Sequence, residues 1–285
     1  MTRLSSDLIS GMAETIDAYD IELAQKTGLT LRQIAARTAG ISEEALCAAF
    51  ETESVAAIPV TSGQGVIEGF TQAVQAIIHH LGCPSFITES CDAAGLAEGI
   101  EKGASILFLA DDVRFIAVNL SQKCVVDNDL ATAWSYAYAL DACAGGLKGQ
   151  DVLLIGAGRV GKNALCALDR LGANVGVYDI DGSKVKSLID KYRIKREKNL
   201  SDALDRYTLL FDASPAPDIL HPEHIKPETI IAACGIPLGL SDKARILVEG
   251  RLIHDPLQLG TTAMLAIAVG YGLHNKCGGR IGRIA

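Results

Sequence analysis

The chain has 285 residues, 49% of them hydrophobic, so it is long enough for two domains with ordinary cores. Its net charge of -8 and the absence of a lysine or arginine cluster argue against nucleic acid and anionic membranes as partners and favour a small molecule. No run of about 18 apolar residues occurs and the amino terminus lacks the apolar core of a secretion signal, so we expect a cytoplasmic protein.

Residues 4 to 50 are predicted to be helical. Hydrophobic residues recur at helical spacing from Leu8 to Tyr19 and again from Leu31 to Ile41. We expect these helices to form a lid or a packing layer.

The next segment alternates between short apolar runs and helical patterns. A helix between successive strands implies that the strands are parallel. The predicted strands cover residues 56–60, 85–88 and 106–110, and the predicted helices cover residues 66–81 and 94–102.

Polar side chains follow two of these predicted strands. Thr61 and Ser62 come after the first strand, and Asp111 comes after the third. Because ligands bind at the carboxyl ends of parallel strands, we expect all three side chains to face a substrate. Simpler interpretations remain open, since Ser62 can cap a helix and Asp111 can be a solvated turn residue.

A helical pattern from Leu130 to Ala144 ends at Gly145-Gly146 and predicts a connector between two domains. The stretch that follows, from Asp151 to Asp179, is typical of one βαβ unit. Its loop, Gly156-x-Gly158-x-x-Gly161, allows a tight turn, a close approach of the backbone to a pyrophosphate, and close packing of helix on strand. The candidate cofactor-binding residues in this loop are Gly156, Ala157, Gly158, Arg159, Val160 and Gly161.

Asp179 lies 23 positions after Gly156, close to the spacing of about 20 expected for the acid that binds the adenosine ribose. A carboxylate repels a ribose 2′-phosphate, and no arginine directly follows Asp179, so we predict NAD rather than NADP as the cofactor. The alternative is a structural glycine turn in an unrelated α/β domain.

Small residues and turns follow three later strands, where the nicotinamide half of a dinucleotide would lie. The candidate cofactor-binding residues there are Ser214, Pro215, Cys234, Gly235 and Asp255. A final helix from Thr261 to about Tyr271 could pack back across the connector, and we expect the tail from Gly278 onward to be disordered. The eight cysteines form no Cys-x-x-Cys pair, which predicts reduced thiols and no metal site.

These patterns together predict an α/β protein with two domains. Residues 1–146 are expected to form a substrate-binding domain, with a helical N-terminal layer, a small parallel sheet and the connector helix. Residues 147–285 are expected to form a Rossmann domain, a doubly wound parallel sheet that binds the dinucleotide.

Motifs across nearly the whole chain carry a specific resemblance. They are Ile58-Pro59-Val60-Thr61-Ser62-Gly63, Gly103-Ala104, Ala110-Asp111-Asp112 with Asn119-Leu120, Gly158-Arg159-Val160-Gly161, Gly235-Ile236-Pro237, and Asp255-Pro256-Leu257 with Leu259-Gly260 and Ala263-Met264-Leu265, together with Leu4 and Thr27-Gly28-Leu29. In these motifs the chain resembles the family of NAD-dependent dehydrogenases that complete pyrrolysine biosynthesis. The chain runs past the usual carboxyl terminus of that family, which leaves oligomer contacts at that end open.

The resemblance implies a substrate in which lysine is joined by an isopeptide bond to 3-methyl-D-ornithine. Hydride transfer to NAD would oxidise the terminal amine, the ornithine α-amine would attack the resulting imine or aldehyde, and ammonia and a pyrroline ring would form. The resemblance also implies that Leu4, Ser62, Asp111 and Asn128 contact the substrate, with Asp111 as the candidate catalytic residue, and we expect a homodimer.

The chemistry of an amine limits what such a site must do. Hydride leaves the carbon only when the amine nitrogen is neutral, and desolvation in a closed cleft lowers the pKa of an amine. No lysine lies in the substrate motifs, which favours catalysis by orientation, worth roughly 7 to 11 kcal/mol. Another amino-acid or saccharopine-type dehydrogenase and an NAD-sensing regulatory module are the alternatives.

Overall fold

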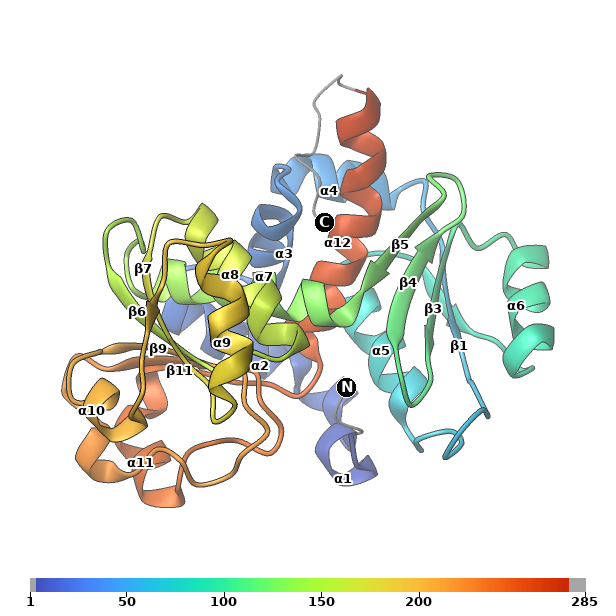
Figure 1. Ribbon diagram of the computed structural model, residues 1–285. Helices are drawn as coiled ribbons and strands as arrows, with labels where there is room; N and C mark the ends of the chain where they lie inside the picture. Colours follow the sequence, from blue (N-terminus) through green and yellow to red (C-terminus); the bar gives the residue numbers. More distant parts are fainter. Residues whose placement is uncertain (1–3, 277–285) are drawn as a thin grey trace.

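The computed structural model describes residues 4–276, with side chains described as far as Tyr271, and it consists of two lobes (Figure 1). The predicted disordered tail from Gly278 lies outside the described residues. None of the helices in the described part of the chain combines the length and apolar character needed to cross a membrane.

The first lobe is built on a sheet of strand order β2-β1-β3-β4-β5. Its strands are β1 (Val55–Ile58), β2 (Ser85–Ile87), β3 (Ile106–Ala110), β4 (Phe115–Asn119) and β5 (Cys124–Asp127). The three strands predicted to be parallel are parallel. Strands β4 and β5 extend the sheet in antiparallel fashion, because only short turns connect β3, β4 and β5, so the sheet is mixed.

Helices cover both faces of this first sheet. Helix α5 (Phe70–His80) packs on one face and α6 (Asp92–Glu101) on the other. Helix α5 begins four residues later than the pattern predicted, because Gly69 at its N-cap has a φ of 80°, in the left-handed region. The loop before it, residues 59–69, is therefore free to line the space between the lobes.

Four N-terminal helices confirm the predicted helical layer. They are α1 (Ser6–Ile9), α2 (Met12–Thr27), α3 (Leu31–Ala39) and α4 (Glu43–Phe50). Helix α2 packs on α5, and α3 packs on the connector helix α7 (Asn128–Cys143).

The last helix, α12 (Gln258–Lys276), returns to the first lobe and runs between α3 and α7 (Figure 1). The buried Asn119 amide donates to the carbonyl oxygen of Ala268 at 3.1 Å, which fixes α12 against β4. The first lobe is therefore completed by α12. This helix belongs by sequence to the predicted second domain, residues 147–285, but it packs in the first lobe.

The second lobe is a wholly parallel sheet of strand order β11-β10-β9-β6-β7-β8. Its strands are β6 (Asp151–Ile155), β7 (Asn174–Tyr178), β8 (Lys195–Arg196), β9 (Leu209–Asp212), β10 (Ile230–Ala233) and β11 (Leu252–Ile253). This order confirms the predicted doubly wound sheet, with the direction of winding changing between β6 and β9.

Helices lie on both faces of the second sheet, as alternate side chains of β6 show. Val152 and Leu154 join the core under α7 and α8, while Leu153 and Ile155 join the core under α10 and α11. The helical segments of this lobe are α8 (Arg159–Arg170), α9 (Gly182–Ile189), α10 (Leu200–Leu204), α11 (Asp242–Val248) and the short 3-10 turns Pro222–His224 and Glu249–Arg251. Ligands bind in such folds beside the strand ends where the winding direction changes, which here face the first lobe.

Candidate active site

A cavity of about 420 Å³ lies between the two lobes and is lined by residues of both. It brings together most of the residues singled out in the sequence. These are Leu4, Asp111, Asn128, Gly158, Arg159, Val160, Ser214, Pro215, Cys234, Gly235 and Asp255. Gly156, Ala157, Gly161 and Asp179 lie outside this lining, at the base of the glycine loop.

The glycine loop between β6 and α8 has the geometry that a dinucleotide pyrophosphate requires. Gly156 has a φ of 95°, which a residue with a side chain rarely adopts. A Cβ on Gly161 would collide with the carbonyl oxygen of Gly156, so this glycine allows α8 to pack closely against the loop. A Cβ on Gly158 would meet no protein atom within 4 Å, so the space beside Gly158 is open for a ligand.

Asp179 lies beside this loop at the end of β7. Its carboxylate accepts hydrogen bonds from the amide of Ala157 at 2.7 Å and from the amide of Asp181 at 2.8 Å. The ammonium group of Lys184 lies 3.8 Å from the carboxylate oxygen that accepts the amide of Asp181. One acid thus ties the glycine loop to the start of α9, where the ribose of a dinucleotide would lie.

Small residues line the cavity at the ends of β9 and β10. A Cβ on Gly235 would collide with the carbonyl oxygen of Ser214, so the two loops can approach each other only with glycine at this position. Behind them, Asp212 is fully buried and accepts a hydrogen bond from the amide of Ser214 at 3.0 Å. Burial raises the pKa of Asp212 to about 6.

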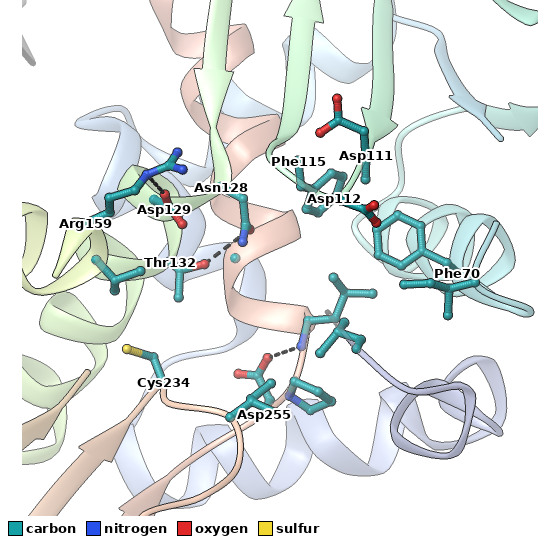
Figure 2. Close-up of a pocket in the computed structure, with 18 of the residues that line it drawn as sticks. Phe70, Asp111, Asp112, Phe115, Asn128, Asp129, Thr132, Arg159, Cys234 and Asp255 are labelled. Carbon is teal, nitrogen blue, oxygen red and sulfur yellow. Dashed lines mark hydrogen bonds and ion pairs between the residues drawn. The ribbon is translucent and has the colours of Figure 1, made fainter. Parts of the chain in front are cut away.

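Two predicted substrate contacts lie in the cavity wall. Leu4 reaches it from the segment before α1, and Asn128 reaches it from the first turn of α7. The hydroxyl of Thr132, one turn later on α7, donates to the Asn128 side-chain oxygen at 3.2 Å (Figure 2). The side-chain orientation of Asn128 is therefore fixed.

Thr61 and Ser62, by contrast, do not line the cavity. The Thr61 amide donates to Asp92 at 2.8 Å and its hydroxyl donates to the same carboxylate, which turns Thr61 toward α6. Ser62 is exposed beside it. The sequence correctly predicted that Thr61 and Ser62 lie in the loop after a strand, here β1. It could not show that Asp92 holds Thr61 away from the cavity.

Asp111 lines the cavity rim, but its carboxylate also stabilises a turn. One oxygen accepts the amides of Val113 at 2.8 Å and Arg114 at 2.7 Å, and these bonds hold the pKa of the carboxyl below its ordinary value. The side chain is exposed and points away from Asp255 and Cys234 (Figure 2). The turn interpretation of Asp111 thus describes its present contacts, while its second oxygen is available to a ligand.

Asp255 is the centre of a buried cluster that the sequence did not predict. Its carboxylate accepts the hydroxyls of Tyr19 at 2.8 Å and Tyr136 at 3.1 Å, and the amides of Leu257 at 3.0 Å and Leu259 at 3.2 Å. A carboxylate has about four acceptor positions, so none remains for a ligand. Asp255 therefore joins α2, α7 and the start of α12 at the cavity wall, and burial raises its pKa.

Arg159 and Asp129 form a second arrangement that sequence patterns did not indicate. Arg159, the first residue of α8, places its Nε 2.6 Å from Asp129 of α7 (Figure 2). Its Nη2 lies 3.7 Å from Asp127. Its Nη1 also donates to the carbonyl oxygen of Val113 at 3.5 Å. One guanidinium therefore connects the glycine loop of the second lobe to the connector and to the β3–β4 turn.

The carboxyl and guanidinium side chains that line the cavity are mostly acidic. They are Asp111, Asp112, Asp129, Asp255 and Arg159. Among the described lining residues no lysine occurs, which agrees with the absence of lysine from the substrate motifs. Nor does the described part of the chain contain a cluster of three histidine, cysteine, aspartate or glutamate side chains able to hold a metal ion. The cavity favours a cationic ligand on its first-lobe side.

Comparisons with known proteins agree with this architecture. Residues 9–126 match the family described as "Pyrrolysine biosynthesis protein PylD, N-terminal domain". Pyrrolysine synthase of Methanosarcina acetivorans is 30% identical over 236 residues, which cover 80% of this chain and 89% of that protein. Pyrrolysine synthase of Methanosarcina barkeri is 28% identical over 268 residues, which cover 93% of this chain and 97% of that protein.

Solved structures share the fold at low identity. Shikimate dehydrogenase of Aquifex aeolicus has a TM-score of 0.53 at 14% identity, covering 80% of this chain and 94% of that chain. Quinate dehydrogenase of Corynebacterium glutamicum in complex with NAD has a TM-score of 0.51 at 13% identity, covering 78% and 94%. Shikimate 5-dehydrogenase of Thermus thermophilus in complex with NADP(H) and shikimate has a TM-score of 0.50 at 16% identity, covering 77% and 94%.

The fold and the cavity thus define a two-lobed protein of the dehydrogenase type, in which a Rossmann lobe faces a smaller α/β lobe. At the level of sequence, the match to pyrrolysine synthases extends well beyond the profile of the first lobe. The chain belongs to the pyrrolysine biosynthesis protein PylD family.

Proposed function

We propose that this protein catalyses the last step of pyrrolysine biosynthesis, the NAD-dependent oxidation of the terminal amine of 3-methyl-D-ornithyl-N6-L-lysine. The observation that carries the proposal is the 30% identity to a pyrrolysine synthase across most of both chains. The cavity supports it, because a loop suited to phosphates lies opposite carboxylates suited to ammonium groups.

NAD is the proposed cofactor, held through its pyrophosphate by the amides of the glycine loop and the start of α8. Gly158 leaves the space that a pyrophosphate needs, and Asp179 stands where a ribose would offer its hydroxyls. Ser214, Pro215, Cys234 and Gly235 would surround the nicotinamide ring. The cofactor supplies a hydride acceptor, and the protein orients the amine-bearing carbon toward it.

The substrate would occupy the first-lobe side of the cavity. Leu4 would contact its apolar carbons, Asn128 would hydrogen-bond to a polar group, and the free oxygen of Asp111 would pair with an ammonium group. Thr61 and Ser62 would reach this substrate only after the loop of residues 61–65 moved. The backbone beside Asp255, rather than its saturated carboxylate, would complete the wall near the nicotinamide.

The reaction then follows from the chemistry of the amine. The terminal ammonium loses a proton, and the carbon bearing it gives up hydride, which leaves an imine. The α-amine of the ornithine moiety attacks that carbon, and ammonia leaves as the pyrroline ring closes. Exclusion of water from a closed cavity favours both the neutral amine and survival of the imine.

We place the protein in the cytoplasm as a homodimer that binds a small molecule, in keeping with a soluble amino-acid substrate and the net charge of -8. Equilibrium sedimentation would test the dimer directly.

The proposed activity has a direct test. Incubation with NAD and the lysyl isopeptide should yield NADH and pyrrolysine in equal amounts. Production of NADH only with another amino acid would instead indicate an amino-acid or saccharopine-type dehydrogenase. Binding of NAD without turnover of any amine would indicate a regulatory module.

A further inference from the structure

The four carboxylates that line the cavity differ in how much capacity they have left to bind a ligand. Asp255 accepts four hydrogen bonds within the protein and has no position left. Asp111 is exposed and holds a turn, and Asp112 accepts the amide of Gln64 at 2.8 Å and holds the loop beside it. Asp129 differs, because it is buried and the described residues give its carboxylate a single ion-pair partner, Arg159.

Asp129 lies close to where the reaction would occur. It is in the first turn of α7, next to Asn128, and it lines the same cavity as Cys234, which stands at the proposed nicotinamide end. Among the described residues only Arg159 occupies an acceptor position of this carboxylate, which leaves three of about four for a ligand. An ammonium group, with three N–H donors, fits such a position.

The partner of Asp129 is placed where it can exchange one anion for another. Arg159 follows Gly158 directly, at the N-terminus of α8, where backbone amides and the helix dipole attract phosphate. Its side chain is 55% exposed, so the guanidinium can rotate toward the open space beside Gly158. A pyrophosphate bound there would compete with Asp129 for the same cation.

We propose that Asp129 binds the ammonium group that is to be oxidised and accepts its proton, and that Arg159 leaves Asp129 for the phosphates when the dinucleotide binds. The inference rests on the proposed amine oxidation and adds to it a base and an order of events. Cofactor binding would expose the carboxylate, and the amine would then enter beside it. One proton passes from the ammonium nitrogen to Asp129, which leaves the neutral amine that hydride loss requires.

The environment of Asp129 suits this task. Burial raises the pKa of its carboxyl, whereas the charge of Arg159 on α8 lowers it. Asp127, the last residue of β5, raises the pKa of Asp129 further, and Arg114, in the turn before β4, lowers it. When the Arg159 guanidinium leaves Asp129 for a phosphate of the cofactor, the pKa of Asp129 should therefore rise, which makes Asp129 a stronger base.

The exchange can be tested without turnover by using ADP-ribose, which supplies the pyrophosphate but no nicotinamide. Calorimetry of the isopeptide should show binding at least about 3-fold tighter with saturating ADP-ribose than without it, because the pyrophosphate would draw Arg159 away from the carboxylate that binds the ammonium group. In Arg159→Gln the two affinities should be equal. Equal affinities in the unmodified protein would overturn the proposed exchange.

The role as base is tested by Asp129→Asn, which keeps the shape and removes the charge. We expect kcat/KM for the isopeptide to fall about 100-fold or more and to lose its decline at low pH, while NAD binds at least as tightly as before. Asp127→Asn is the matched control, because it removes a carboxylate from Arg159 outside the cavity and keeps the helix cap. Its pH profile should keep the decline at low pH, moved toward lower pH because the charge of Asp127 raises the pKa of Asp129.

The outcomes distinguish a failure of the proposed role of Asp129 from a failure of the proposed amine oxidation. If the unmodified protein oxidises the isopeptide and Asp129→Asn does so with the same pH profile, Asp129 is not the base although the proposed function stands. If the unmodified protein oxidises no isopeptide, the proposed function fails, and the ADP-ribose measurement still decides whether Arg159 exchanges partners. Thermal unfolding confirms that each variant is folded, and Asp129→Ser repeats the test if asparagine is not tolerated.

Discussion

The two walls of the cavity recognise ligands by opposite means. The second-lobe wall offers backbone amides, a helix N-terminus and Arg159, all suited to an anion, and its shape depends on glycines. The first-lobe wall offers side chains that come from segments far apart in the chain, and its charged side chains, Asp111, Asp112 and Asp129, are acidic. The difference shows that a phosphate site can be built from one local motif, whereas an amine site here must be assembled by the tertiary fold. The walls meet where Arg159 pairs with Asp129.

The largest expected effect concerns the glycines of the second-lobe wall. Gly161→Ala would place a Cβ against the carbonyl oxygen of Gly156, so the free energy of unfolding should fall by about 3 kcal/mol. Gly158→Ala meets no protein atom, so its stability should change by less than about 0.5 kcal/mol while the Kd for NAD rises about 10-fold or more. Chemical denaturation and calorimetry measure the two effects, and equal stability losses would contradict the assigned roles.

The next effect belongs to the first-lobe wall. Asp111→Asn can keep both hydrogen bonds of the turn, because an amide oxygen accepts them as a carboxylate does. Only the charge is lost, so kcat/KM for the isopeptide should fall roughly 10-fold while the Kd for NAD is unchanged. Normal turnover of this variant would show that Asp111 serves the turn alone.

A smaller effect is expected at the ribose end of the second-lobe wall. Asp179→Ser removes the carboxylate that would accept the ribose hydroxyls and repel a 2′-phosphate. The ratio of kcat/KM values for NAD and NADP should therefore narrow in the variant. An unchanged ratio would mean that Asp179 only ties the glycine loop to α9 through its bonds to Ala157 and Asp181.

The smallest expected effect is a change in dynamics at the edge of the first-lobe wall. Leu4 lines the cavity, and Tyr19 on α2 donates to Asp255 in the cavity wall, so the segment of residues 4–20 contacts the cavity or its wall at both ends. If these helices close over the substrate, amide hydrogen exchange in this segment should slow when product is bound. Equal exchange with and without product would favour a fixed packing layer.

The two walls also differ in how far the sequence predicted them. The glycine loop, Asp179 and the doubly wound sheet follow from local spacing and strand pattern, because a βαβ unit brings these residues together by itself. The first lobe was predicted as helices and parallel strands, but its antiparallel extension by β4 and β5 was not.

Side-chain partners over long distances could not be read from one sequence. Asp92 captures Thr61 from 31 residues away, and Tyr19 reaches Asp255 across 236 residues. Strand-end position indicated which loops face the cavity, but not which way each side chain turns within its loop. For the same reason, the helical spacing of Tyr136 does not show that its hydroxyl meets a buried carboxylate.

The central claim is that hydride passes from the amine-bearing carbon, held by the first-lobe wall, to a nicotinamide held by the second. An isopeptide with both hydrogens on that carbon replaced by deuterium tests it most directly, with the NADH and pyrrolysine analysed by mass spectrometry. The account predicts one deuterium in the nicotinamide ring of NADH and one retained in the pyrroline ring. Pyrrolysine formed without deuterium in NADH would contradict it.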